Sequence, residues 1–258
     1  MELRRVFDTV CEQFDRYRPR YCPELFADMI EYAHIGPGRD VLELGPGTGQ
    51  ATGPVLDTLC AYHAIELGRN MTDMMQRKYG DRPNFSIVND DFITHDFGPQ
   101  RFDAIYSAAT IQWIPEEIAF SKTFELLRPG GTLAMMLTKG DYRTPNEALY
   151  EKIQAVYSRY YKPETPYTHG GFRYDHAPAY GYVDFEKRQY RGRRVFTAEE
   201  YVAFCGTHCD HIAVPEPDRS RLFDGLRRAV LEAGDRIVFE DTYVLYLTRK
   251  PRDARAIP

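Results

Sequence analysis

Short apolar runs separated by longer mixed segments organise the first half of the chain. The run VLEL at 41–44 is followed at once by the glycine-rich stretch GPGTG and then by a helix-compatible segment that reaches Cys60. Further apolar runs occupy residues 61–66, 85–89, 102–109 and 132–137. Each run has the length of a strand, and the segments between the runs are long enough for helices. The alternation therefore predicts a parallel sheet with helices on both of its faces.

The amino-terminal residues show a helical pattern instead. Apolar positions at helical spacing lie on either side of the sequence RPRYCP, which is typical of a loop. We therefore expect two helices within residues 1–38, ahead of the first strand. Later in the chain, RPGG at 128–131 predicts a turn before the strand at 132–137, because proline ends a helix and glycine permits positive φ.

The pattern loosens after Lys139. Helices are predicted at 145–161, 197–206 and 216–233, and strands are predicted at 185–196 and 241–250. Thr197 is expected to cap the second of these helices, because acidic residues follow it. The segment 162–182 is rich in Pro, Gly, Tyr and His, and it predicts a long loop or cap over a ligand.

These elements together predict an α/β fold. We expect a doubly wound, mostly parallel sheet with one antiparallel strand at the end, an N-terminal helical lid and a helical cap insertion. The expected parts are the helical lid at 1–38, a cofactor-binding core at 39–139, a cap and substrate region with a sheet strand at 140–235, and the closing strand of the core at 236–258.

Composition and charge narrow the class of protein. The chain has 33 Lys and Arg against 38 Asp and Glu, a formal net charge of −5, so no field of the whole molecule attracts nucleic acid or an anionic membrane. No apolar run approaches the roughly 20 residues of a membrane span, and the amino-terminal sequence is too charged for a signal peptide. We therefore expect a cytoplasmic protein. Its five cysteines are odd in number and sparse, so we expect free thiols.

The glycine-rich stretch has the properties of a ligand-binding loop. Gly45, Gly47 and Gly49 come directly after a predicted strand and before a helix, where the backbone can approach a ligand closely and helix N–H groups point outward. A dinucleotide-binding loop needs a further glycine at position 50, where this chain has Gln50, and no GK[ST] sequence is present. The spacing therefore favours a ligand without a pyrophosphate.

Acidic residues follow the next two strands. Glu66 ends the strand at 61–66, about 20 residues after the loop, where doubly wound folds place a carboxylate on a ribose diol. Asp90 and Asp91 follow the next strand, and an acid at this sheet edge can accept a hydrogen bond from an adenine amine while Phe92 lines the ring. The alternative is that each acid only caps a helix, but three acids in register with a glycine loop favour a nucleoside site.

Five motifs carry a resemblance to a known family: VLELGPGTG, HAIELG, NDDF, FDAIYSAATIQWI and LLRPGGTLAMM. Together they resemble the successive motifs of class I S-adenosylmethionine-dependent methyltransferases over about residues 35–140. The flanking sequences FDRYRPRYCPEL, TAEEYVAFCGTH and LYLTRK are similar to the trans-aconitate methyltransferase-like small-molecule branch. The resemblance implies a Rossmann-like methyltransferase fold, S-adenosyl-L-methionine as the cofactor, and a small-molecule acceptor that is a carboxylate, a phenol or an amine.

The resemblance also implies roles for individual residues. It places the glycine loop at the methionine part of the cofactor, Glu66 at the ribose, and Asp91 with Phe92 at the adenine. Arg18, in the RP motif, is a candidate for the cofactor carboxylate together with the neighbouring arginines of that segment. The residues implied in cofactor binding are Arg18, Glu43, Gly45, Gly47, Thr48, Gly49, Glu66, Asp90, Asp91, Phe92, Ser107, Ala108, Ala109 and Gln112.

Methyl transfer from a sulfonium mainly requires alignment of the nucleophile, the methyl group and the sulfur. An amine or hydroxyl acceptor can use a base, and the candidate bases are His169 and His176 in the expected cap. A carboxylate acceptor needs no base, and arginines such as Arg143 and Arg173 would then matter more. Trp113 is expected at the reaction side, where its ring can face a sulfonium; the alternative is a core residue.

Two other patterns lead to weaker hypotheses. Cys205, His208, Cys209 and His211 have the spacing of zinc ligands, but no second ligand pair is nearby, so we expect no metal. The basic stretch KRQYRGRR at 187–194 can contact phosphate, although strand alternation sends many of its side chains to solvent.

The alternatives to a methyltransferase are a nicotinamide-dependent oxidoreductase, disfavoured by Gln50, and an RNA-modifying or non-catalytic cofactor-binding protein. As partners we expect a small-molecule substrate, no membrane and no nucleic acid, in a monomer or homodimer.

Overall fold

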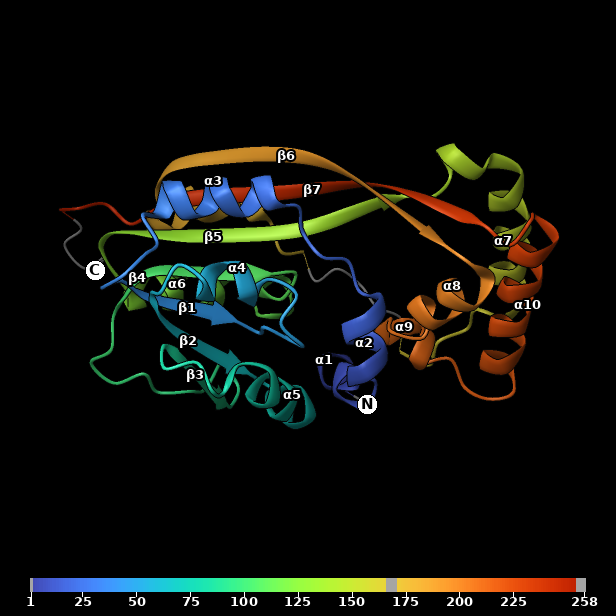
Figure 1. Cartoon of the computed structure of the whole chain (residues 1–258), viewed down its shortest axis with the longest axis horizontal. Helices are drawn as coiled ribbons and strands as arrows, with labels where there is room; N and C mark the ends of the chain where they lie inside the picture. Colours follow the sequence, from blue (N-terminus) through green and yellow to red (C-terminus); the bar gives the residue numbers. More distant parts are fainter. Residues whose placement is uncertain (1, 166–170, 254–258) are drawn as a thin grey trace. The chain divides into compact units, whose positions relative to one another are not determined.

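The structure, a computed structural model that describes residues 2–165 and 171–253, contains a seven-stranded sheet. The strands follow the order β3-β2-β1-β4-β5-β7-β6 (Figure 1). They are β1 (Asp40–Leu44), β2 (Ala61–Glu66), β3 (Phe85–Asn89), β4 (Phe102–Ala108), β5 (Leu127–Asp141), β6 (Val183–Phe196) and β7 (Ile237–Arg249). The prediction of a doubly wound, mostly parallel α/β sheet is confirmed.

The first five strands are parallel, and β7 reverses direction. Strand β1 pairs in parallel with β2 and β4, β2 with β3, and β4 with β5. Lys250, just after β7, exchanges backbone hydrogen bonds with Gly130 and Gly131 near the start of β5. At the other end of β5, Gly140 lies beside Asp241. Residue numbers therefore fall along β7 as they rise along β5, which makes this pair antiparallel.

Helices precede and connect these strands. They are α1 (Leu3–Val6), α2 (Cys11–Tyr17), α3 (Pro23–Ala33), α4 (Thr52–Leu56), α5 (Arg69–Tyr79), α6 (Glu116–Leu126), α7 (Glu147–Tyr160), α8 (Ala198–Cys205), α9 (Cys209–Ile212) and α10 (Asp218–Glu232). Short 3-10 helices are η1 (Phe7–Thr9), η2 (Ile111–Trp113), η3 (Thr144–Asn146) and η4 (Tyr174–Tyr180). The predicted cap of α8 is confirmed, because the Thr197 side chain accepts from the N–H of Glu200 and the Glu200 carboxylate accepts from the N–H of Thr197.

The turn predicted at 128–131 is wrong in part, because this sequence already belongs to β5. Leu127 pairs with Phe102 of β4, and the backbone of the following glycines is bonded to Lys250. Gly130 keeps the positive φ of a turn residue, at 79°. Strand pairing on both sides therefore extends β5 through a sequence whose composition is typical of a turn.

The chain divides into two compact units. The sheet unit comprises Arg20–Thr138, His169–Tyr190 and Tyr243–Pro258, and the helical unit comprises Met1–Pro19, Lys139–Thr168 and Arg191–Thr242. Helix α3 belongs to the sheet unit, whereas the predicted boundary grouped it with the first helices as a lid. The reason is packing, since Leu25 and Met29 of α3 are fully buried in one cluster with Val41 of β1.

The two faces of the sheet in the sheet unit carry two separate apolar clusters. Val41 and its neighbours on β2 and β4 face the helices α3 and α4. Leu42 and Leu44 alternate with them and face the other side, where α6 and η4 pack. Full burial of one such side chain stabilises the fold by about 1.5–3 kcal/mol, so the alternation fixes which face each residue of β1 presents.

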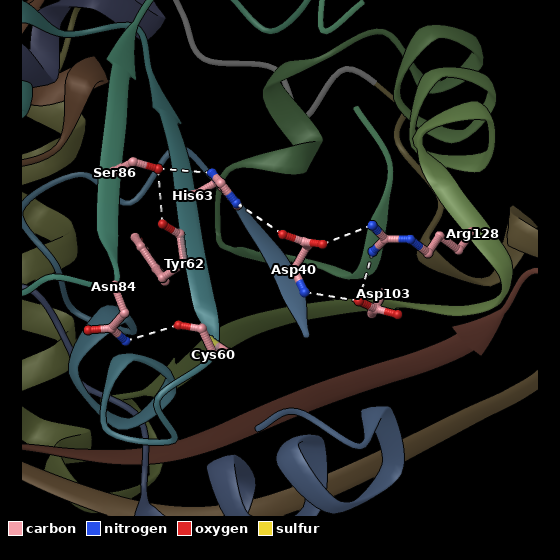
Figure 2. Close-up of polar contacts among 8 residues, drawn as sticks. All are labelled: Asp40, Cys60, Tyr62, His63, Asn84, Ser86, Asp103 and Arg128. Atoms are coloured by element: carbon pink, nitrogen blue, oxygen red, sulfur yellow. Dashed lines mark hydrogen bonds and ion pairs between the residues drawn. The ribbon is translucent and has the colours of Figure 1, made fainter. Parts of the chain in front are cut away.

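Polar side chains hold together the amino-terminal ends of the parallel strands (Figure 2). Asp40 at the start of β1 pairs with Arg128 at 2.8 Å and lies 3.5 Å from His63 of β2. Arg128 also reaches Asp103 of β4 at 2.8 Å, and His63 Nδ1 lies 2.9 Å from Ser86 Oγ of β3. This edge of the sheet is thus occupied by contacts between strands, which leaves the opposite edge for a ligand. In the described ranges, no helix is both long and apolar enough to cross a bilayer.

A buried polar chain lies inside the helical unit. Asp210 Oδ1 lies 2.9 Å from His211 Nδ1, His211 Nε2 lies 2.7 Å from the Tyr157 hydroxyl, and Tyr161 donates to Asp210 Oδ2 at 2.6 Å. These contacts occupy both imidazole nitrogens, and the residues that the structure describes contain no metal-binding group of three or more His, Cys, Asp or Glu. Of the residues with zinc-like spacing after Cys205, His211 therefore takes part in buried hydrogen bonds within the helical unit.

We predict that this chain of contacts makes stability fall at alkaline pH. Burial lowers the pKa of His211, but the interactions with Asp210 and Cys205 together outweigh burial and raise the pKa to about 9. The stabilisation is complete below the ordinary histidine value of about 6.5 and is lost as pH rises through 9. The unfolding free energy should drop by about 2–3 kcal/mol between pH 6.5 and 10 through this group, measured by urea denaturation.

The control is His34, an exposed histidine at the end of α3. His211→Asn should remove most of this alkaline loss, whereas His34→Asn should leave the pH profile of the natural chain unchanged. An equal alkaline loss in the natural chain and in His211→Asn would contradict the assignment.

Candidate functional site

The glycine loop is fixed to the end of β2 by one carboxylate. Glu66 Oε2 accepts a hydrogen bond from the N–H of Gly47 at 2.9 Å, and Oε1 accepts from the N–H of Gly68 at 2.8 Å. Gly45 donates to the carbonyl of Ile65 at 2.9 Å. Glu66 itself is 6% exposed. The loop after β1 and the end of β2 therefore form one structure, with a carboxylate between them.

Close packing requires glycine at two positions of the loop. Gly45 has a φ of 59°, and a Cβ there would lie 2.3 Å from Thr110 Cγ2. Thr110 also donates to the carbonyl of Gly45 at 2.9 Å. Gly49 has a φ of 93°, and its Cβ would lie 3.0 Å from Met75 of α5. The absent side chains thus allow the segment after β4 to press directly against the loop.

Thr48 faces the inside of the loop. It is fully buried, and its hydroxyl accepts from the Gln50 side chain at 2.6 Å. Lys78 of α5 donates to the Thr48 carbonyl at 2.7 Å. Gln50, the residue that replaces a glycine of the dinucleotide pattern, therefore helps to hold the loop in shape.

Glu43 lies beneath the loop as a buried carboxyl group. Its Oε2 accepts from Thr52 at 2.7 Å, from Tyr106 at 2.6 Å, and from Tyr62. Burial raises the pKa of Glu43, against the lowering effect of these hydroxyls. Its Oε1 is buried with no partner in the described part of the chain. An unsatisfied buried oxygen is rare and calls for an explanation, and a bound polar group is one.

The acids after β3 lie next to Glu66, as predicted. The N–H of Asp90 donates to the Glu66 carbonyl at 3.0 Å. The Asp90 carboxylate lies 2.8 Å from His95 Nδ1, and this contact lowers the pKa of Asp90. Asp91 Oδ1 accepts from a backbone N–H two residues later at 3.0 Å. Phe92 is 6% exposed and belongs to the core.

The segment after β4 combines buried support with an exposed turn. Ser107 is fully buried and accepts from the N–H of Ile111 at 2.9 Å, so it holds the turn η2. Ala108 is half-buried, and Ala109 is exposed with a φ of 56°, unusual for a residue with a side chain. Gln112 donates to the Ala109 carbonyl at 2.9 Å. The turn therefore presents Ala109 and Gln112, while Ser107 supports it from below.

The structure describes two of the three candidate catalytic residues. Trp113 is half-buried in η2. His176 lies in η4 and its Nδ1 is 2.9 Å from Glu116 Oε1. His169 lies outside the described residues. The catalytic roles of these three residues stay predictions.

The arginine candidates are held by other parts of the chain. Arg18 belongs to the helical unit, where it donates to the Thr207 carbonyl at 2.7 Å and lies 5.0 Å from the Phe14 ring. Its predicted contact with the cofactor stays a prediction. Arg143 is exposed and lies over a tyrosine ring, and Arg173 is paired with Asp175 at 3.3 Å.

The site fits S-adenosylmethionine in its donor and acceptor groups. A carboxylate has about four lone-pair positions, and the N–H groups of Gly47 and Gly68 each occupy one of those on Glu66. The glycine backbone lies close to this carboxylate, and Glu43 Oε1 is an acceptor that lacks a partner within the described ranges. The sequence interpretation gave no role to Thr110, although it lies within the motif FDAIYSAATIQWI, or to Glu116, which belongs to no motif.

Comparison with known proteins agrees with this geometry. Residues 41–131, about a third of the chain, match a family model described as a methyltransferase domain. Residues 41–131 are therefore similar to a methyltransferase domain, and the sheet has the fold that methyltransferase structures share. The prediction of S-adenosylmethionine as the cofactor is confirmed at this level, whereas the trans-aconitate-like branch stays a prediction.

Individual relatives differ in what they methylate. The chain is 33% identical over 73 residues, 28% of its length, to a ribosomal RNA small subunit methyltransferase A of Picosynechococcus, of which this covers 27%. It is 29% identical over 114 residues to malonyl-[acyl-carrier protein] O-methyltransferase 1 of Ilyobacter polytropus, with 42% of each chain covered. These matches span less than half of the relatives' lengths.

A solved structure shows the same fold over most of the chain. Phosphoethanolamine N-methyltransferase 2 of Haemonchus contortus, in complex with phosphomonomethylethanolamine and S-adenosylhomocysteine, superposes with a TM-score of 0.57. The sequences are 16% identical, and the alignment covers 96% of this chain and 60% of the other. This similarity supports the fold and leaves the acceptor open.

We predict that Glu66→Gln weakens cofactor binding. The amide has one acceptor oxygen and no charge, and hydrogen bonds to a charged partner contribute about 1.5–3 kcal/mol. The affinity for S-adenosylhomocysteine, measured by calorimetry, should fall on the order of 10–100-fold. Glu232→Gln, an exposed acid on α10, is the control and should bind normally. An unchanged affinity of Glu66→Gln would show that the carboxylate does not contact the ligand.

Proposed function

We propose that this chain transfers the methyl group of S-adenosylmethionine to a small-molecule acceptor. The observation that supports this most strongly is the Glu66 carboxylate, which joins the glycine loop to the end of β2 through the N–H groups of Gly47 and Gly68. A carboxylate held between a glycine loop and the ends of parallel strands is suited to a ribose diol.

In this proposal the chain mainly binds the cofactor and aligns the acceptor with its methyl group. Glu66 holds the ribose, Asp91 and Phe92 border the adenine, and the glycine backbone surrounds the methionine part. The bound cofactor supplies a methyl group on a positively charged sulfur. Gln112 and Trp113, on the turn after β4, would then face the acceptor, and alignment supplies most of the rate enhancement.

The charge distribution favours a small molecule over RNA as the acceptor. Arginines of β6, the strand that carries the basic stretch, are paired with acids. Arg188 lies 3.3 Å from Asp28, and Arg193 lies 3.3 Å from Glu240. Paired guanidinium groups release fewer counterions on binding phosphate, so this strand is a poor anchor for a nucleic acid. The match to a ribosomal RNA methyltransferase covers 28% of the chain. Because of this match, RNA is the alternative acceptor to test.

We predict that the natural chain binds S-adenosylmethionine and S-adenosylhomocysteine and does not bind NADH, because Gln50 stands where a pyrophosphate loop needs glycine. Calorimetry with the three ligands measures this directly. Binding of NADH without any response to S-adenosylhomocysteine would favour the oxidoreductase alternative instead.

The acceptor class is tested separately by transfer of a labelled methyl group. We expect transfer to members of a panel of small acids, phenols and amines, and none to bulk ribosomal or transfer RNA. Turnover confined to RNA would reject the small-molecule proposal while leaving cofactor binding intact.

A further inference from the structure

Glu116, the first residue of α6, organises the segment that carries His176. Its Oε2 accepts from the N–H of Arg173 at 2.7 Å, and its Oε1 lies 2.9 Å from His176 Nδ1. The Tyr180 hydroxyl donates to the same Oε1 at 3.4 Å. The hydrogen bonds from Arg173 and His176 lower the pKa of Glu116 although its partial burial opposes this. Glu116 is therefore an ionised acceptor near neutral pH.

The contact with Glu116 leaves one imidazole nitrogen available. A carboxylate only accepts hydrogen bonds, so Nδ1 of His176 donates and Nε2 carries the lone pair of the neutral ring. Within the described part of the chain, the His176 imidazole has no hydrogen bond other than this one. Its side chain is 38% exposed, so Nε2 can meet a molecule from solution.

A series of contacts connects this pair to the glycine loop. Thr110 donates to the carbonyl of Gly45 at 2.9 Å, and two residues later the Gln112 side chain accepts from the Tyr174 hydroxyl at 2.9 Å. Tyr174 precedes His176 in η4 and stacks on Tyr246 of β7, with ring centroids 4.9 Å apart. The segment with His176 is thus held against the turn after β4, next to the proposed cofactor site.

We propose that Glu116 positions His176 as the general base of the reaction, and that the acceptor is therefore a hydroxyl or an amine that loses a proton. This inference rests on the proposed function. The acceptor oxygen or nitrogen uses its lone pair to form the bond to the methyl carbon, and the carbon–sulfur electron pair stays on sulfur, which becomes a neutral thioether. The acceptor proton passes to His176 Nε2, and the resulting imidazolium is stabilised by Glu116.

The charges around His176 support this acceptor class. Glu116 Oε1 lies 2.9 Å from His176 Nδ1, and Asp175 adjoins His176 on η4, so two carboxylates lie near the imidazole. Arg173 is the nearby cation and is paired with Asp175 at 3.3 Å. Carboxylates repel an anionic acceptor and favour a neutral or cationic one. The expectation that Arg173 clamps a carboxylate acceptor is therefore not supported by its surroundings.

The first test is kinetic. Labelled methyl transfer is measured with catechol, ethanolamine and tyramine as hydroxyl and amine probes, and with malonate and citrate as carboxylate probes. His176→Asn should lower kcat on the order of 10²–10⁴-fold. Glu116→Gln retains an oxygen for the N–H of Arg173 and should lower kcat about 10-fold or more. In this variant the acid limb of the kcat–pH profile should move to lower pH, because a neutral amide stabilises the imidazolium less.

Matched controls separate a positioning role from a structural one. Glu117→Gln removes a neighbouring charge on the same helix turn, and His34→Asn removes a histidine at the end of α3. Both should keep the natural kcat and pH profile. Every variant should retain its affinity for S-adenosylhomocysteine, and ¹⁵N NMR of the natural chain should show the neutral ring of His176 protonated at Nδ1.

The outcomes distinguish this inference from the proposed function. Failure of the natural chain to bind S-adenosylhomocysteine would overturn the proposed function itself. Normal binding together with turnover of carboxylates alone, no turnover of any hydroxyl or amine, an unshifted pH profile in Glu116→Gln, or a ring protonated at Nε2 would each overturn the inference and leave the proposed function standing.

Discussion

The double hydrogen bond from Gly47 and Gly68 to the Glu66 carboxylate is the contact on which the rest of the site depends. It needs an acid at the last position of β2 and a loop without side chains after β1. Once the loop is held there, Thr110 can bond to the carbonyl of Gly45, and the turn after β4 takes its place beside it. The ends of β1, β2 and β4 are therefore positioned, directly or through the glycine loop, by one buried carboxylate.

Most of this arrangement was predictable from the sequence, because it follows local rules. Strand-length apolar runs and the glycine loop are recognised within a few residues. Parallel strands end at one edge of a sheet, so the acids after two neighbouring strands had to lie close together, and the N–H of Asp90 does bond to the carbonyl of Glu66. The cap of α8 by Thr197 is likewise encoded within four residues.

The features that escaped prediction depend on contacts between distant residues. His176 was a candidate base, but its partner Glu116 lies 60 positions earlier, at a helix start that carries no motif. The sequence already disfavoured a metal at the cysteines and histidines near 205–211, but it gave no sign that Asp210 and Tyr157 contact His211. In the basic strand, charges that looked available for phosphate are paired with acids from other elements.

The division of the chain into two units has a consequence for engineering. The boundaries at 138/139, 190/191 and 242/243 fall inside β5, β6 and β7 rather than in linkers. Replacing the helical unit by one from a relative would therefore require three splices within paired strands. A splice one residue out of register would turn every following side chain to the opposite face of the sheet. New acceptor specificities are thus more accessible through substitutions within this chain than through exchange of whole modules.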